Sequence, residues 1–356
     1  MQRFIFFILV ILLSVQPFFG QNNFFLTKCW EFLTDDLSSY KIASDNHKQL
    51  FIPLADSSIV ALDKNGKIIW KSEIGGNLIS DLKIFGDYLI FAVRNEIGVK
   101  ETKLRAVSKE TGLTIWNTEL SDNNSISVEI FKSNNEILVV TGKGLLFNFD
   151  NTNGKQVNQD NFQTEITSNI ELVGQVLYFA NQNNQVQEYS LITKKSNHFQ
   201  FDRPISRLYF HEQNNLLIAD QLGRLIQFNI SKQKKGWTLR TGGVVNSITF
   251  FNGRYYVSSN DNYVYCLSFD NGEIVWRKRL SGRTEGEILI NSDESKYISA
   301  VIAGQLAIVL DLVKGKTLNQ ITVDGDLYFI SEPLVVSKDV YFSLNKGLVY
   351  YSQSGC

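Results

Sequence analysis

The histidines are the first side chains to consider for metal or acid–base chemistry. The chain has only three, at His47, His198 and His211, and no two of them have the spacing at which an element presents a pair of metal ligands. His198 also falls where comparable segments of the chain carry Trp, so we interpret it as a substitution at a structural position. The histidines therefore predict no metal site.

Two pairs of carboxylates have a spacing that could support chemistry. Glu285 and Glu287, like Asp324 and Asp326, are two residues apart, which would place each pair on one face of a strand. Paired acids and cation sites both need such an arrangement. Both pairs are expected in loops that lead to the next group of strands, where solvated carboxylates are common. We therefore expect no catalytic residue, no metal and no cofactor, and interpret the protein as a non-enzyme.

The distribution of charge is more informative than any single acid. Residues 190–290 contain fourteen Lys and Arg and eight Asp and Glu, a balance of +6, so the rest of the chain carries −7 to give the overall −1. Such a basic sector could attract an acidic partner; an ordinary solvated strand face is the alternative. The candidate partner-binding residues are Lys232, Lys234, Lys235, Arg277, Lys278 and Arg279.

The composition is that of an ordinary globular protein. Of the 356 residues, 44% are hydrophobic and 20% are charged, and the chain lacks the basic excess of nucleic-acid-binding proteins. It has only 4 Pro but 25 Phe and 14 Tyr, which favours strands, because aromatic side chains pack well on pleated surfaces and Pro interrupts ladders.

The N-terminus has the layout of an export signal. Arg3 precedes the apolar run Phe4–Val15, and Pro17 and Gly20 follow it. The run is shorter than the roughly 20 residues that span a bilayer, although an uncleaved anchor remains the alternative. We interpret residues 1–20 as a signal peptide and residues 21–356 as one domain that does not itself span the membrane. The expected location is outside the cytoplasm, periplasmic or secreted.

A repeated segment organises the rest of the chain. Val60–Trp70, Leu104–Trp116 and Val264–Trp276 each read as strand, turn and strand, and each places Trp four residues after a Gly. The Trp-equivalent positions recur about every 41 residues, at 30, 70, 116, 158, 198, 237, 276 and 319. This period predicts an all-β propeller of eight four-stranded antiparallel blades, with seven blades as the alternative. The chain ends before its last repeat is complete, so we expect the N-terminal strand to complete the final blade and close the ring.

Superposing the last repeat on the first suggests one covalent bond. It places Cys356 and Cys29 on either side of the break in the ring, at the positions of Lys67 and Ile69 in the first repeat. In an exported chain a Cys29–Cys356 disulfide would staple this closure; two free thiols are the alternative. Cys266 aligns with Ala61 and Ala106 at a small inward position and is expected to be a buried, inert thiol.

At this point the residues resemble a known family. Ala106–Trp116 is similar to the repeat of pyrroloquinoline-quinone-like (PQQ-like) propellers, with Ser108 in place of Asp, and Ser331–Val335 resembles the inner strand of that family. The family docks its repeat tryptophans between neighbouring blades. The resemblance therefore implies structural, inter-blade roles for all five tryptophans, Trp30, Trp70, Trp116, Trp237 and Trp276.

Within this family the chain is more similar to the BamB family of outer-membrane assembly factors than to the quinoprotein dehydrogenases. The latter are much longer, and their adjacent cysteine pair is missing here. The resemblance implies a monomeric, non-catalytic scaffold that binds another protein of the cell envelope, with no nucleic acid. One departure is that no Cys directly follows the apolar run, so no lipid anchor is expected. A ligand-binding propeller that uses its axial funnel, or a degenerate quinoprotein dehydrogenase, is the alternative.

Overall fold

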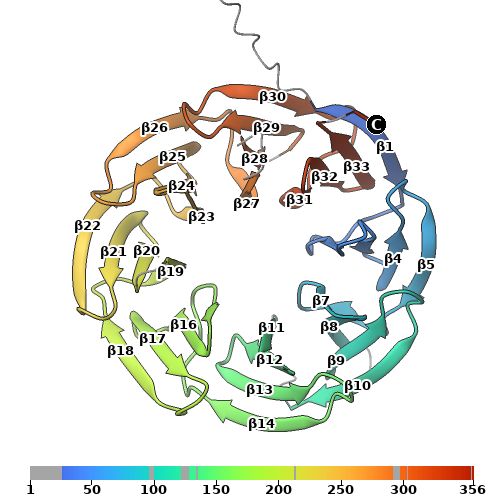
Figure 1. Ribbon diagram of the computed structural model, residues 1–356, viewed down its shortest axis with the longest axis horizontal. Helices are drawn as coiled ribbons and strands as arrows, with labels where there is room; N and C mark the ends of the chain where they lie inside the picture. Colours follow the sequence, from blue (N-terminus) through green and yellow to red (C-terminus); the bar gives the residue numbers. More distant parts are fainter. Residues whose placement is uncertain are drawn as a thin grey trace, which may run out of the picture.

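The computed structural model describes residues 26–95, 100–121, 128–133, 135–211, 214–291, 297–302, 304–353 and 355–356, with the backbone alone at 285, 291 and 297–302. The expected signal peptide, residues 1–20, lies outside this range. The described residues form strands and turns without a helix, and therefore contain no helix long and apolar enough to cross a membrane. Their strands make eight antiparallel sheets, which surround a central axis as the blades of a propeller (Figure 1). The expected all-β, eight-bladed architecture is confirmed.

We label the blades A to H in chain order. The strands of blades A to D are β2 (Ala43–Ser44), β3 (Leu50–Pro53), β4 (Ser58–Leu62) and β5 (Ile68–Glu73) in A; β6 (Asn77–Leu78), β7 (Lys83–Phe85), β8 (Tyr88–Asn95), β9 (Glu101–Ser108) and β10 (Thr114–Leu120) in B; β11 (Val128–Ser133), β12 (Glu136–Thr141), β13 (Leu145–Asp150) and β14 (Gln156–Asn161) in C; and β15 (Glu171–Val173), β16 (Val176–Ala180), β17 (Gln185–Ser190) and β18 (Ser196–Gln200) in D.

The strands of blades E to H are β19 (Ile205–His211), β20 (Asn215–Asp220), β21 (Arg224–Asn229) and β22 (Lys234–Arg240) in E; β23 (Val245–Phe251), β24 (Arg254–Ser259), β25 (Tyr263–Ser268) and β26 (Ile274–Arg279) in F; β27 (Thr284–Asn291), β28 (Tyr297–Ile302), β29 (Leu306–Asp311) and β30 (Thr317–Thr322) in G; and β31 (Leu334–Val336), β32 (Asp339–Leu344), β33 (Gly347–Ser352) and β1 (Thr27–Leu33) in H. In blades A to G the chain runs from an inner strand at the axis to an outer strand at the rim (Figure 1). In blade H it runs outward from β31 to β33, and β1 supplies the outer strand.

The hydrophobic core lies in the seams between blades. In the seam between A and B, for example, Trp70 and Phe51 of blade A pack with Leu89, Phe91 and Val107 of blade B. The two middle strands of a blade are covered on both faces by neighbouring blades, which explains why their apolar residues run without strict alternation. Every residue of β3 and β4 is buried, whereas the outer strand β5 is largely exposed.

The ring is closed between the two ends of the chain. Strand β1 pairs with β33 in antiparallel register, with Trp30 opposite Tyr350 and Phe32 opposite Leu348. The N-terminal strand is thus the outer strand of blade H, whose other three strands come from the C-terminus. This is the closure expected from the truncated last repeat, and it removes an unpaired sheet edge at the seam.

Candidate functional site

Each tryptophan of the repeat contacts the following blade. The indole of Trp70 lies against Gly112 in blade B, and its Nε1–H donates to the carbonyl of Lys109 at 2.9 Å. A Cβ on that glycine would lie 2.6 Å from the ring. The same pairing of indole and turn glycine recurs between Trp30 and Gly66, Trp116 and Gly154, Trp237 and Gly272, and Trp276 and Gly315. These tryptophans are therefore elements of the blade seams.

Some repeats carry another residue at the Trp position, and their turns differ as well. His198 lies opposite Gln187, in the register that Trp70 has with Ala61 and Trp276 with Cys266. Asn158 also replaces Trp, and the turn residue of the next blade is Lys194, which instead makes an ion pair with Asp160 at 3.0 Å. At the seam after His198 the turn residue is Gln233. In these two seams the tryptophan and the glycine are absent together.

The cysteines lie as the superposed repeats suggested. Cys29 and Cys356 form a disulfide, with their Cα atoms 5.3 Å apart, beside the β1–β33 closure. Cys266 is a free thiol that is fully buried, and burial raises its pKa to about 11. This position is consequently unsuited to thiolate chemistry near neutral pH.

The six basic candidates lie on the outer wall of two neighbouring blades. Lys234 and Lys235 belong to β22 of blade E, with Lys232 in the turn before it, and Arg277, Lys278 and Arg279 belong to β26 of blade F. The two strands are adjacent on the rim (Figure 1). Within the described chain none of the six makes a salt bridge. We call these six residues the outer basic face.

Aromatic rings hold two members of the outer basic face in place. The Lys235 ammonium lies 5.3 Å from the centroid of Phe201, and the Arg277 guanidinium lies 5.5 Å from that of Tyr263. Such contacts orient a cation without neutralising it. The outer basic face can therefore present positive charge to solvent.

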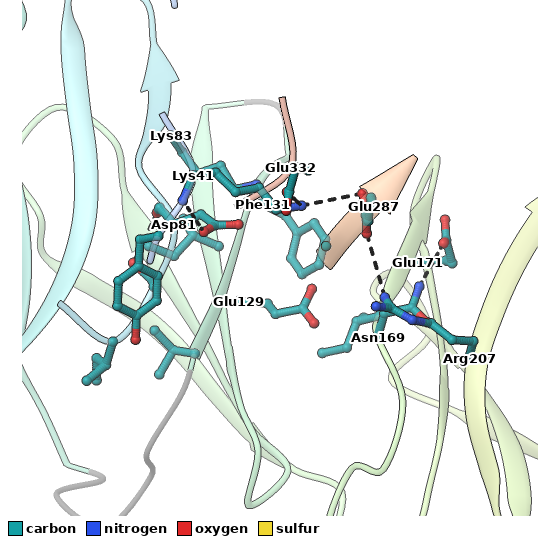
Figure 2. Close-up of a pocket in the computed structure, with 17 residues that line it drawn as sticks. Lys41, Asp81, Lys83, Glu129, Phe131, Asn169, Glu171, Arg207, Glu287 and Glu332 are labelled. Atoms are coloured by element: carbon teal, nitrogen blue, oxygen red, sulfur yellow. Dashed lines mark hydrogen bonds and ion pairs between the residues drawn. The ribbon is translucent and has the colours of Figure 1, made fainter. Parts of the chain in front are cut away.

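A second candidate site lies on the propeller axis. A cavity of about 490 Å³ is lined by the inner strands of most blades and by the residues just before them (Figure 2). Eight equivalent positions surround the axis, one from each blade, and each precedes a hydrophobic residue or Pro of its inner segment. They line this cavity or a smaller one of about 190 Å³ beside it: Lys41, Asp81, Glu129, Asn169, Arg207, Ser247, Glu287 and Glu332. We call them the axial ring.

Members of the axial ring also join adjacent blades. The Asn169 side chain accepts a hydrogen bond from the Leu208 N–H and donates one to the Leu208 carbonyl, both at 2.9 Å. Ser247 Oγ accepts from the Ile288 N–H at 3.1 Å, and Asp81 accepts from the Lys41 N–H at 3.2 Å. At these three positions of the ring, hydrogen bonds between a side chain of one blade and the backbone of a neighbouring blade link the blades at the axis.

A chain of ion pairs crosses the cavity. Lys41 Nζ lies 2.7 Å from Glu332 and 3.4 Å from Glu287, whose other carboxylate oxygen lies 3.6 Å from Arg207 (Figure 2). Burial alone would lower the pKa of Lys41, but the carboxylates of Glu332 and Glu287 outweigh that effect and raise it. Lys41 is therefore firmly charged in this cavity.

Two further carboxyl groups have pKa values raised to near neutral pH. Burial raises the pKa of Glu129 to about 7, against a hydrogen bond from Ile170. Burial, with the neighbouring charges of Glu129 and Glu287, raises the pKa of Glu171 to about 7, although Asn169 donates a hydrogen bond to it at 2.9 Å. Both groups change charge near neutral pH.

The expectation for Glu285 and Glu287 was wrong about their location. They belong to β27, an inner strand, and Glu287 lines the axial cavity; the side chain of Glu285 is outside the described set. Asp324 and Asp326 do lie in an exposed loop, where Asp326 pairs with Lys346. Among the described residues no group of three or more His, Cys, Asp or Glu side chains could hold a metal ion.

Sequence reasoning otherwise missed the axial ring, yet a signal was present. The outer Trp marks the repeat clearly, whereas the residue before the inner-strand hydrophobic changes in type from one repeat to the next. That position recurs about every 40 residues, and in six of the eight repeats it carries a charge, after Tyr40, Ser80, Val128, Ser206, Gly286 and Ser331. Aligning the inner strands would have placed these charges on the axis.

The docked tryptophans, the closure of the ring by the N-terminal strand and the eight similar blades define a PQQ-like β-propeller with a charged axial cavity. The family comparison agrees: residues 27–178, 100–204 and 198–355 match the family described as outer membrane protein assembly factor BamB. The chain belongs to this family.

Solved structures show the same fold at low sequence identity. The crystal structure of BamB from Moraxella catarrhalis superposes with a TM-score of 0.72 and 15% identity, over 92% of this chain and 100% of that one. The computationally designed Ika8 protein also gives 0.72, with 13% identity, over 91% and 99%. Among curated proteins, the tetrathionate hydrolase of Acidithiobacillus ferrooxidans is 33% identical over 75 residues, which cover 20% of this chain and only 15% of the hydrolase.

Proposed function

We propose that this protein is a non-catalytic propeller outside the cytoplasm that serves as a protein-binding scaffold in the cell envelope. Its membership of a family described as outer membrane protein assembly factors supports an envelope role. The similarity to the tetrathionate hydrolase is confined to one short segment and gives little support to an enzymatic role. No particular residue among those described supports a quinoprotein activity.

The outer basic face is the observation that carries the proposal. Five cations on two adjacent outer strands, and Lys232 in the turn before one of them, lack salt bridges within the described residues. Two of the six are oriented by aromatic rings. Charges arranged in this way accelerate association with an oppositely charged surface and select against wrong partners. We therefore infer that the partner presents an acidic surface.

The disulfide supports a location outside the cytoplasm. Disulfides persist in oxidising compartments and are rare in the reducing cytosol, and Cys29–Cys356 lies beside the β1–β33 pairing that closes the ring. An export signal in residues 1–20 would deliver the chain to such a compartment.

A ligand-binding role for the axial funnel is the second candidate. The cavity of about 490 Å³ with converging polar groups is the observation in its favour, because such cavities are common binding sites. This role is compatible with a scaffold, since the two surfaces lie on different parts of the ring.

The direct test is capture of partners from an envelope extract of the source cell, with residues 21–356 as bait at low and moderate salt. We expect recovery of envelope proteins, including outer-membrane assembly components, and weaker recovery at higher salt. A bait that is folded by circular dichroism but captures no envelope protein at either salt would contradict the scaffold role.

A further inference from the structure

The axial cavity contains more negative than positive groups. Its charged lining consists of Lys41, Lys83, Arg207, Asp81, Glu129, Glu171, Glu287 and Glu332. Two of the cations are already engaged, because Lys41 pairs with Glu332 and Glu287, and Arg207 pairs with Glu287. Of the remaining carboxylates, Glu129 lies in the field of Lys83 and Lys41, and Glu171 in that of Arg207.

Glu129 and Glu171 are left without an ion-pair partner in the described part of the chain. Glu129 receives a hydrogen bond from the backbone of Ile170, and Glu171 receives one from Asn169. Lys83 acts on Glu129 through its charge, but the two make no salt bridge. A carboxylate removed from water without a cation is costly, and a bound cation would relieve that cost.

The shape and lining of the cavity suit an organic cation. Phe131 lies two residues after Glu129, just as Glu171 lies two residues after Asn169 in the next blade. Figure 2 shows the Phe131 ring beside the cavity, with Glu129 directed toward the same space. An aromatic ring can contact the methylene groups of a ligand or the cation itself. A bare metal ion fits less well, since the described residues contain no cluster of three metal-ligating side chains.

We propose that the axial cavity binds an alkylammonium or guanidinium group between the carboxylates of Glu129 and Glu171, with Phe131 against its aliphatic part. The group could belong to a free amine or to a lysine or arginine side chain of a partner loop. The proposal does not depend on the outer basic face, because it rests on different residues at the axis.

Binding at this site should depend on pH. The titratable or charged groups that face Glu129 and Glu171 are Lys41, Asp81, Lys83, Arg207, Glu287 and Glu332, with Tyr40 and Tyr209 at the edges of the two cavities. Of the acids, Glu129 and Glu171 are the two whose pKa is raised to about 7. Above that value both are ionised, and an ammonium group, with a pKa near 10, still carries its charge. Acidification through neutrality should therefore release the ligand.

Isothermal titration calorimetry on residues 21–356 tests the proposal with three probes. These are n-butylammonium, a short glycine–serine peptide with blocked termini and one central lysine, and the same peptide with that lysine acetylated. At about pH 8 we expect the charged probes to bind, and at about pH 5.5 we expect affinity to fall roughly tenfold or more. The acetylated peptide should not bind, because it carries no charge on the side chain.

Variants separate the cavity from general electrostatics. Glu129→Gln and, independently, Glu171→Gln should each weaken the charged probes by about tenfold at the higher pH. Glu119→Gln, which makes the same charge change on the exposed outer strand β10, should leave affinity within about twofold. Circular dichroism would confirm that each variant is folded.

The outcomes distinguish the two sources of the cation. Binding of both charged probes supports a site for free amines and side chains alike, and binding of the lysine peptide alone supports a partner loop. The proposal is overturned if neither charged probe binds at about pH 8, if the acetylated peptide binds equally well, or if folded Glu129→Gln and Glu171→Gln retain wild-type affinity.

Discussion

The indole of Trp116 lies so close to Gly154 of the next blade that a Cβ atom on this glycine would be 2.3 Å from the ring. The indole N–H also donates to the carbonyl of Asn151, in the same turn, at 3.2 Å. Gly154 has a φ of +67°, so the residue meets two requirements at once, a left-handed backbone and space for the ring. The turn of one blade is thus the docking surface for the tryptophan of the blade before it.

This contact predicts a large effect of Gly154→Ala. The added methyl group must displace Trp116 or the turn, and overpacking of this kind costs about 1–3 kcal/mol in addition to the backbone strain. Gly174→Ala is the matched control, because Gly174 has a similar φ of +58° but nothing within 4 Å of its added Cβ. Chemical denaturation should show Gly154→Ala to be clearly less stable than Gly174→Ala. Equal losses would mean that the indole contact contributes little.

The disulfide predicts a specific thiol count. Under denaturing, non-reducing conditions we expect one reactive thiol, that of Cys266, and three after reduction. A bond across 327 residues should stabilise the ring by roughly 6 kcal/mol on the chain-entropy account, so Cys29→Ser with Cys356→Ser should lower the free energy of unfolding. Three reactive thiols before reduction would contradict the bond.

The sequence was sufficient for the fold because each repeat carries its own pattern. Alternating strands, Gly turns and the Trp period predict the blades, and the incomplete last repeat predicts the closure. The partner of each Trp was harder to predict, because the glycine it contacts belongs to the next repeat rather than its own. The axial ring was missed since its members, such as Glu129 and Arg207, gain meaning only when distant inner strands meet at the axis.

The ion pairs of the cavity predict a cost for removing Lys41. Lys41→Met would leave Glu332, whose side chain is only 12% exposed, without its cation at 2.7 Å. Uncompensated buried charge typically costs about 3–5 kcal/mol, and a partly open cavity should bring this nearer 2. Lys143→Met is the control, because the Lys143–Glu165 pair is about half exposed on both sides and should contribute less than about 1 kcal/mol. Similar stability of the two variants would show that the axial pair is effectively solvated.

The raised pKa values of Glu129 and Glu171 predict lower stability at higher pH. Each carboxyl has a pKa of about 7 in the folded chain against an ordinary value of 4.5, so the folded state holds more protons between these values. The resulting stabilisation is complete below about pH 4.5 and is lost as pH rises through 7, with a magnitude on the order of 3 kcal/mol for one group.

Denaturation of wild-type protein, Glu129→Gln and Glu119→Gln at about pH 5 and 8 measures this effect. Glu129→Gln should reduce the loss of stability at the higher pH, because a neutral amide replaces a carboxyl that would otherwise be ionised. Glu119→Gln, on the exposed outer strand, should behave as wild type. A loss of equal size in all three proteins would exclude Glu129 as its source.

The scaffold proposal is tested most directly by quantitative capture from envelope extract with three folded baits. These are the wild-type protein, the reversal Arg277→Glu with Lys278→Glu and Arg279→Glu, and a control reversal of Lys64, Lys67 and Lys155 to Glu. The control residues are exposed and lie on blades A and C. We predict that the first reversal lowers partner recovery by about tenfold at low salt, that moderate salt diminishes this difference, and that the control stays within about twofold of wild type. Equal recovery by all three baits, or equal losses from both reversals, would contradict a partner-binding role for the outer basic face.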